Sequence, residues 1–264
     1  MIFRRALIAS ALLLVGCAGG LVILLSVDHL GGYQRQIDDG ARAIEAGTTD
    51  AARAAGHIQR GRAYAEIARY RHVMKSIGAA EYIRLYQSAM LDLDAAVRLD
   101  PNNLETFNAR GQTYFEHSWT AIENRFESED AAKTWLARAK ADFTAAIDRD
   151  ASNETALDYR GMTNEKQRDY TAAISDYTRL TKVNAKLGTI RLADVFCLRG
   201  TTWIGQKQYD KAVADLEQSI SLGASIDGCD CDPYSPLLWT YLRVLVISTK
   251  AGRWCIALKA TIAG

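Results

Sequence analysis

A short recurring pattern constrains the fold of this chain more than any other feature. An arginine-glycine pair is followed, three residues after the glycine, by an aromatic residue at Tyr64, Tyr114 and Trp203, and by Asn164 in a fourth copy. The glycines of these pairs lie 50, 50 and 39 residues apart. Repetition on this scale predicts one supersecondary unit for each copy.

A second block follows each glycine, with a small residue, a bulky residue four positions later and usually a small one seven positions later. The four blocks are Ala89, Leu93 and Ala96; Ala139, Phe143 and Ala146; Ala173, Tyr177 and Leu180; and Ala212, Leu216 and Ser219. Spacings of four and three mark one face of a helix. Only three prolines occur, so we expect an almost all-α chain.

The two blocks together resemble the tetratricopeptide repeat (TPR), in which two antiparallel helices meet at small residues within about 34 residues. Residues 154–187 and 193–226 look like full copies, 54–103 and 104–153 like versions with longer helices, and 237–264 like a partial copy. The resemblance implies an all-α, right-handed superhelical solenoid over residues 51–264. It also implies a function in protein-protein interaction, without naming a partner.

The N-terminus has a different character. Residues 6–27 carry no charge over 22 positions, enough for a membrane-spanning helix. Arg4 and Arg5 precede this span, so the positive-inside rule predicts a cytoplasmic N-terminus, an inner-membrane anchor at residues 1–27, and periplasmic repeats. Residues 28–50 are then expected to form a juxtamembrane linker with a short helix. A lipoprotein signal with Cys17 as the lipidated residue, or a cleaved secretory signal, stays open.

Each arginine of the repeated pairs has an aspartate directly before the bulky residue of its second block. The pairs are Arg60 with Asp92, Arg110 with Asp142, Arg160 with Asp176, and Arg199 with Asp215. We predict ion pairs at the seam between the two helices, because an arginine beside a close-packing glycine would otherwise be desolvated alone. The alternative is a row of arginines that binds acidic ligand groups.

Catalytic and cofactor signatures are scarce. The formal net charge is +1, which gives no electrostatic footprint for nucleic acid. The four histidines include no pair spaced for a metal, and no phosphate-binding loop or nucleophile elbow occurs. We therefore expect neither an enzyme nor a cofactor, a metal or a small-molecule substrate.

Four cysteines beyond the anchor suit an oxidising compartment. We predict that Cys229 and Cys231 each pair outward, with Cys197 and Cys255 in some order, because a bridge between residues two apart is strained. A metal site built from Cys229, Cys231 and their neighbouring aspartates is the alternative.

These features favour a periplasmic adaptor that is tethered to the inner membrane and presents a groove to a protein of an envelope or membrane complex. By resemblance to the family, the groove residues are Asn108, Gln112, Phe115, Asp158, Met162, Glu165 and Thr201. A second partner surface is expected at Trp239 and Leu242, in an apolar C-terminal segment. The alternatives are a permanent structural subunit of a larger membrane complex and an outer-membrane TPR lipoprotein.

Overall fold

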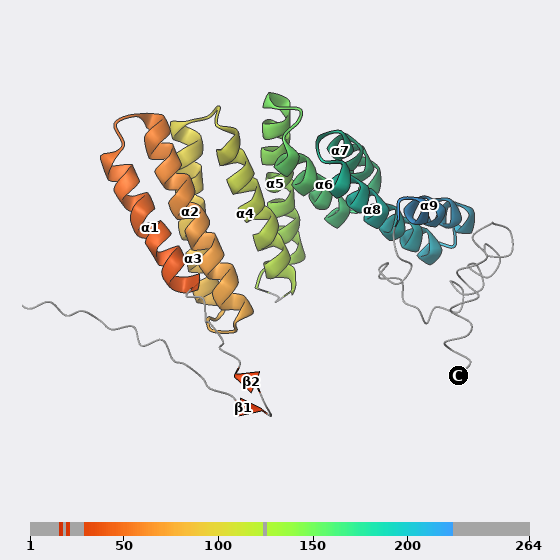
Figure 1. Cartoon of the computed structure of the whole chain (residues 1–264), viewed down its shortest axis with the longest axis horizontal. Helices are drawn as coiled ribbons and strands as arrows, with labels where there is room; N and C mark the ends of the chain where they lie inside the picture. Colours follow the sequence, from red (N-terminus) through yellow and green to blue (C-terminus); the bar gives the residue numbers. More distant parts are fainter. Residues whose placement is uncertain (1–15, 18–19, 22–28, 124–125, 224–264) are drawn as a thin grey trace, which may run out of the picture. The chain divides into compact units, whose positions relative to one another are not determined.

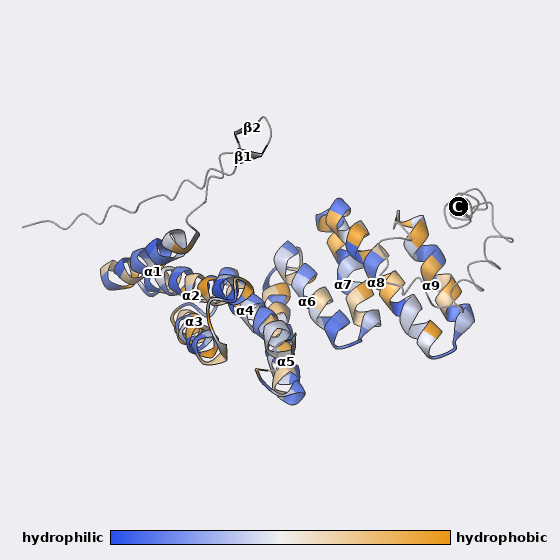
Figure 2. Cartoon of the chain, turned by 90° about the horizontal axis from the view of Figure 1, so that it is seen from below, coloured by the Kyte–Doolittle hydropathy of each residue, from blue (hydrophilic) through white to orange (hydrophobic). Residues whose placement is uncertain are grey.

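The computed structural model describes residues 16–17, 20–21, 29–123 and 126–223 (Figure 1). Nearly all of these residues are helical. The helices are α1 (His29–Ala46), α2 (Asp50–Val73), α3 (Ala79–Leu99), α4 (Leu104–Glu123), α5 (Glu129–Arg149), α6 (Glu154–Lys166), α7 (Tyr170–Val183), α8 (Ala185–Gly205) and α9 (Tyr209–Ser221). The chain divides into two compact units, Met1–Asp100 and Pro101–Gly264. Each helix carries both hydrophilic and hydrophobic residues (Figure 2), as expected of helices that bury one face.

The first unit contains α1, α2 and α3. Gly40 and Gly56 let α1 and α2 approach closely, since a Cβ added at either glycine would lie 2.9 Å from the carbonyl oxygen of the other. Residues 28–50 were expected to form a linker with a short helix, and most of this segment is instead the 18-residue helix α1, which packs against α2. The next pair, α2 and α3, meets where Gly61 faces Leu93.

The second unit contains three hairpins, α4–α5, α6–α7 and α8–α9. In each, the glycine of the repeated pair faces the bulky residue of the second block. A Cβ at Gly161 would lie 2.2 Å from a ring carbon of Tyr177, one at Gly111 2.7 Å from Phe143, and one at Gly200 3.0 Å from Leu216. The sequence pattern thus records the closest approach of the two helices, where only hydrogen fits.

Short polar side chains set where most of the second-unit helices begin. Ser128, Asn153, Asp169 and Asn184 each accept a hydrogen bond from the backbone N–H three residues later, the usual N-cap contact. Asn184 also follows the end of α7, so α8 starts at Ala185. Residues 188–192, expected to separate two repeats, are consequently part of α8.

All four predicted seam ion pairs are confirmed. In every pair Nε and Nη2 of the arginine donate to the two carboxylate oxygens of the aspartate, over distances of 2.5–3.0 Å. The aspartates are buried, with 3–6% of their surface exposed. Two parallel charge-assisted bonds compensate for burying each carboxylate. These arginines are therefore engaged within the fold, which argues against the alternative of a ligand-binding row.

Three of these aspartates contact a further nitrogen. His57 Nδ1 lies 2.8 Å from Asp92, and Asn164 Nδ2 and Trp203 Nε1 donate to Asp176 and Asp215, each over 3.0 Å. Asn164 and Trp203 both stand four residues after their arginine, one helical turn along the same face. The asparagine that interrupts the aromatic pattern of the repeats therefore keeps a donor at this position.

The N-terminal segment differs from its expected structure. Gly16–Cys17 (β1) pairs antiparallel with Gly20–Leu21 (β2). These are the only described residues of the expected membrane helix, 6–27, and they are not helical; the rest of that span lies outside the described part of the chain. Among the helices that the structure does describe, none combines the length and the apolar character needed to cross a bilayer.

Candidate functional site

The candidate site lies on the first helices of the hairpins in the second unit. We call it the first-helix face and define it by Trp119 of α4, Met162, Glu165 and Lys166 of α6, and Leu198 and Thr202 of α8. Lys166 links α4 to α6, since its Nζ lies 3.5 Å from the ring centroid of Trp119. Trp119 and Leu198 are 48% and 41% exposed, so this face presents large apolar side chains to solvent.

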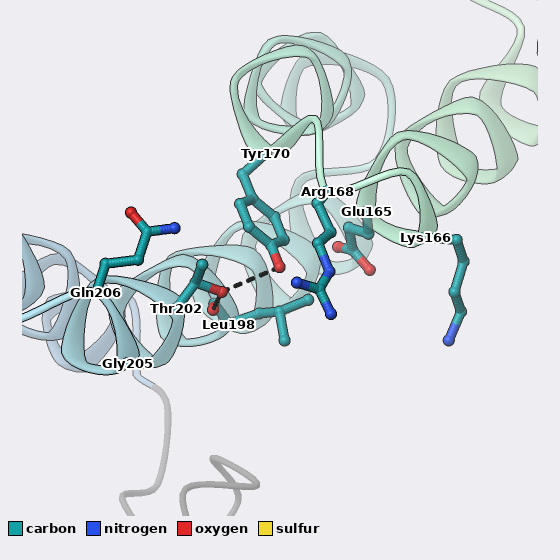
Figure 3. Close-up of a pocket in the computed structure, with 8 residues that line it drawn as sticks. All are labelled: Glu165, Lys166, Arg168, Tyr170, Leu198, Thr202, Gly205 and Gln206. Atoms are coloured by element: carbon teal, nitrogen blue, oxygen red, sulfur yellow. Dashed lines mark hydrogen bonds between the residues drawn. The ribbon is translucent and has the colours of Figure 1, made fainter.

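A cavity of about 530 Å³ opens on this face between the end of α6 and the side of α8 (Figure 3). It is lined by Glu165, Lys166, Arg168, Tyr170, Leu198, Thr202, Gly205 and Gln206. Thr202 Oγ1 and the Tyr170 hydroxyl lie 3.1 Å apart at hydrogen-bonding geometry and tie α7 to α8 along one wall. The cavity therefore depends on the packing of two successive hairpins.

The α6–α7 turn shapes the mouth of the cavity. Arg168 adopts a left-handed backbone conformation with φ of 60°, and its N–H donates to the Glu165 carbonyl over 2.8 Å. The next N–H, of Asp169, donates to the Asn164 carbonyl over 2.8 Å. These bonds satisfy carbonyls that the helix end would leave unpaired. They also place the Arg168 side chain beside the cavity (Figure 3).

An ion pair between hairpins lies next to the cavity. Arg191 of α8 donates to both carboxylate oxygens of Asp158 on α6, over 2.6 and 3.0 Å. Its Nη2 also lies 3.3 Å from the Met162 sulfur. The bond to Asp158 raises the pKa of Arg191, which keeps the guanidinium charged. This pair joins two hairpins, whereas each seam pair joins the helices of one hairpin.

Burial dominates the titration of the other charged groups on this face. It raises the pKa of Glu165, lowers that of Lys166, and raises that of Asp194 on the exposed side of α8. Burial, and then the nearby Glu165 carboxylate, raise the pKa of the Tyr177 hydroxyl. Each shift disfavours the charged form, as expected where desolvation outweighs favourable partners.

Three of the seven expected groove residues are occupied in internal packing. Asn108 is 6% exposed and donates to the Asn153 side chain over 3.3 Å. Phe115 is 7% exposed and packs edge to face on Tyr159. Asp158 is held by Arg191. Other side chains of the same chain therefore cover or bind these three residues.

The other expected residues divide into two groups. Gln112, Met162, Glu165 and Thr201 are half-buried, and Glu165 lines the cavity. Trp239 and Leu242 lie outside the described residues, as do Cys229, Cys231 and Cys255. Cys197 is buried on α8, and the cysteine pairing stays a prediction. Among the described residues, no cluster of three or more histidine, cysteine or acidic side chains could hold a metal ion.

The hairpins α2–α3, α4–α5, α6–α7 and α8–α9 each pack a glycine of the first helix against a bulky residue of the second. The chain has a TPR-like fold. No family model matches the sequence, and no curated protein is significantly similar to it.

Several solved structures are similar to the chain. MamA matches with a TM-score of 0.47 and 15% identity, over 75% of this chain and 96% of MamA. TTC0263, a thermophilic TPR protein of Thermus thermophilus, matches with a TM-score of 0.38 and 13% identity, over 81% and 99% of the two chains. A monomeric mutant of IFIT1 with Gppp-AAAA matches with a TM-score of 0.40 and 12% identity, over 81% and 58%. Similarity this low transfers no function to the chain.

Proposed function

We propose that this chain is a non-enzymatic, membrane-tethered scaffold that binds other proteins through the first-helix face. The observation that carries the proposal is the exposure of Trp119 and Leu198 on either side of the α6 end, next to an open cavity. Apolar side chains grouped beside a cavity favour an interaction surface. The seam arginines, by contrast, are engaged inside the hairpins.

The tether and the compartment are further parts of the proposal. In this proposal the uncharged residues 6–27 tether the chain to the membrane, and Arg4 and Arg5 hold the N-terminus in the cytoplasm, which puts the repeats in the periplasm. The proposal also includes a right-handed superhelical arrangement of the repeats and disulfides at the C-terminal cysteines. Protease added to spheroplasts is expected to degrade the repeats, and repeats that stay intact until the membrane is permeabilised would contradict the orientation.

The scaffold proposal is tested by purifying the tagged full-length protein from cross-linked native membranes. Leu198→Glu is expected to reduce the recovery of specific protein partners, because it puts a charge into the apolar part of the face. Val183→Glu is the matched control: Val183 is also 41% exposed but lies on α7, outside the first-helix face.

Three outcomes are informative. Loss of partners with Leu198→Glu but not with Val183→Glu supports the proposal. Wild-type protein that recovers no specific partner contradicts a scaffold function, and equal recovery with both variants contradicts the assignment of this face. A salt wash then separates an adaptor, which dissociates from its complex, from a permanent structural subunit, which does not. Mass spectrometry at Cys17 decides the lipoprotein alternative.

A further inference from the structure

Glu165 occupies an unusual position in the cavity wall. It is half-buried and lines the cavity together with Leu198 and Thr202 (Figure 3). Within the part of the chain that the structure describes, no cation forms an ion pair with its carboxylate, and Arg191 and Lys166 lower the pKa of Glu165 less than burial raises it. A partly desolvated carboxylate without a counter-ion is unfavourable in the free protein. A cation entering the cavity would therefore offset an existing cost.

Beneath Glu165 lies the side chain of Tyr177, which has 0% of its surface exposed. Its hydroxyl interacts with the Glu165 carboxyl, which raises the pKa of Tyr177 and lowers that of Glu165, although the two groups fall short of ideal hydrogen-bonding geometry. Buried hydroxyls in native proteins are normally hydrogen-bonded. This second polar group is available to hold Glu165 once a ligand has oriented the carboxylate.

The neighbouring charges differ in how they would affect a ligand. Arg191 is already held by Asp158, and Asp194 is close enough to raise the pKa of Glu165 further. Lys166 points away from the other labelled side chains in Figure 3 and lies on Trp119. Arg168 is the second cation that lines the cavity, and it is exposed on the α6–α7 turn, so water solvates its charge.

We propose that the cavity binds an arginine or lysine side chain of a partner protein, with its cationic head at Glu165 and its aliphatic stem along Leu198. The volume of the cavity falls within the range of about 300–1,000 Å³ that is usual for ligand sites. Leu198 is exposed on the cavity wall and can cover the methylene groups of such a side chain. This inference rests on the scaffold proposal and specifies the chemistry of its partner.

The test uses full-length protein in detergent micelles and a displayed library of random heptapeptides as the probe. Selection on the wild-type protein is expected to enrich arginine and lysine, and selection on Glu165→Gln to lose that enrichment. The tightest wild-type peptide should bind Glu165→Gln about tenfold more weakly, equivalent to about 1.4 kcal/mol. Arg168→Gln is the matched control from the same cavity, and it is expected to bind that peptide as tightly or more tightly.

Three results would overturn the inference. Enrichment of acidic residues on the wild-type protein, lost in Arg168→Gln, would make Arg168 the recognition group. Equal enrichment on wild-type and Glu165→Gln protein, or none on either, would show that Glu165 does not select ligands. Unchanged circular dichroism and thermal melting of both variants establish that they are folded. Failure of the scaffold proposal can be distinguished from failure of this inference, because it would appear as the absence of specific partners in the purification from native membranes.

Discussion

The ion pair between Arg160 and Asp176 allows the strongest quantitative prediction. Arg160→Ala removes two bonds to the Asp176 carboxylate, of 3.0 and 2.5 Å, and one of 3.2 Å to Thr144. The Asp176 side chain is 4% exposed, so water cannot readily replace the guanidinium, and the Asn164 amide is the donor that stays on the carboxylate. Breaking a buried pair costs about 3–5 kcal/mol.

We expect the lower end of that range, about 3 kcal/mol, because the Arg160 side chain is 16% exposed and water can enter the space it leaves. For a chain of this size this corresponds to a drop in melting temperature of roughly 6–12 °C. Because repeat arrays lose stability locally, amide hydrogen exchange of α6 and α7 should report the change together with thermal melting.

A double-mutant cycle isolates the pair. Asp176→Ala alone should also destabilise, and the double variant should cost less than the sum of the two single changes, with a coupling of about 2 kcal/mol. Lys133→Ala removes an ion pair whose side chains are 70% and 91% exposed and should leave melting unchanged. An Arg160→Ala protein with unaltered melting and exchange would refute the reasoning that the seam pairs hold the hairpins together.

Three further predictions test the packing, the buried histidine and the turns. Gly161→Ala should lower the free energy of unfolding by about 2–3 kcal/mol, because the added methyl group meets the Tyr177 ring. Gly205→Ala, with no atom within 4 Å of the added methyl group, should leave the free energy of unfolding unchanged or raise it by up to about 1 kcal/mol. Equal effects of the two changes in melting experiments would contradict the close approach of the helices at Gly161. Burial lowers the pKa of His117 below 6.5, so the unfolded chain takes up a proton first as the pH falls and the stability declines below about pH 6.5. His117→Phe should reduce this dependence of the melting temperature on pH. An unchanged dependence would argue that the histidine is not buried. Lys207 has a φ of 60°, so Lys207→Gly should stabilise the α8–α9 hairpin by about 0.5–1 kcal/mol in urea unfolding, and destabilisation would show that this backbone conformation is absent.

The hairpin seams could be predicted from the sequence because every interaction there is tied to helical periodicity. In each hairpin an arginine directly precedes the glycine and an aspartate directly precedes the bulky residue of the next helix, although arginine and aspartate lie 32 residues apart in two hairpins and 16 apart in the other two. Arg160 and Asp176 could therefore be paired without coordinates. The sequence predicted only a short helix where α1 lies, because the contact of α1 with α2 depends on Gly40 and Gly56, which belong to no copy of the pattern.

The candidate site was predictable only in part. Glu165 and Met162 follow from their positions on the first helix of a repeat. The pair between Asp158 and Arg191 does not, because it depends on α8 starting at Ala185, before the recognisable repeat. Contacts between successive hairpins, such as Lys166 on Trp119, depend on side-chain packing across variable spacing. The Asn184 cap was the one local signal for the early start of α8.

The central claim, that the first-helix face contacts a partner protein, is tested most directly by site-specific photo-cross-linking in cells. A photoreactive amino acid at Leu198 is compared with one at Glu217, an exposed position on α9. The account predicts a discrete adduct of higher mass from position 198 and none from position 217, with the adduct lost on Glu165→Gln if a basic side chain is the anchor. Adducts of equal yield from both positions, or from position 217 alone, would contradict it.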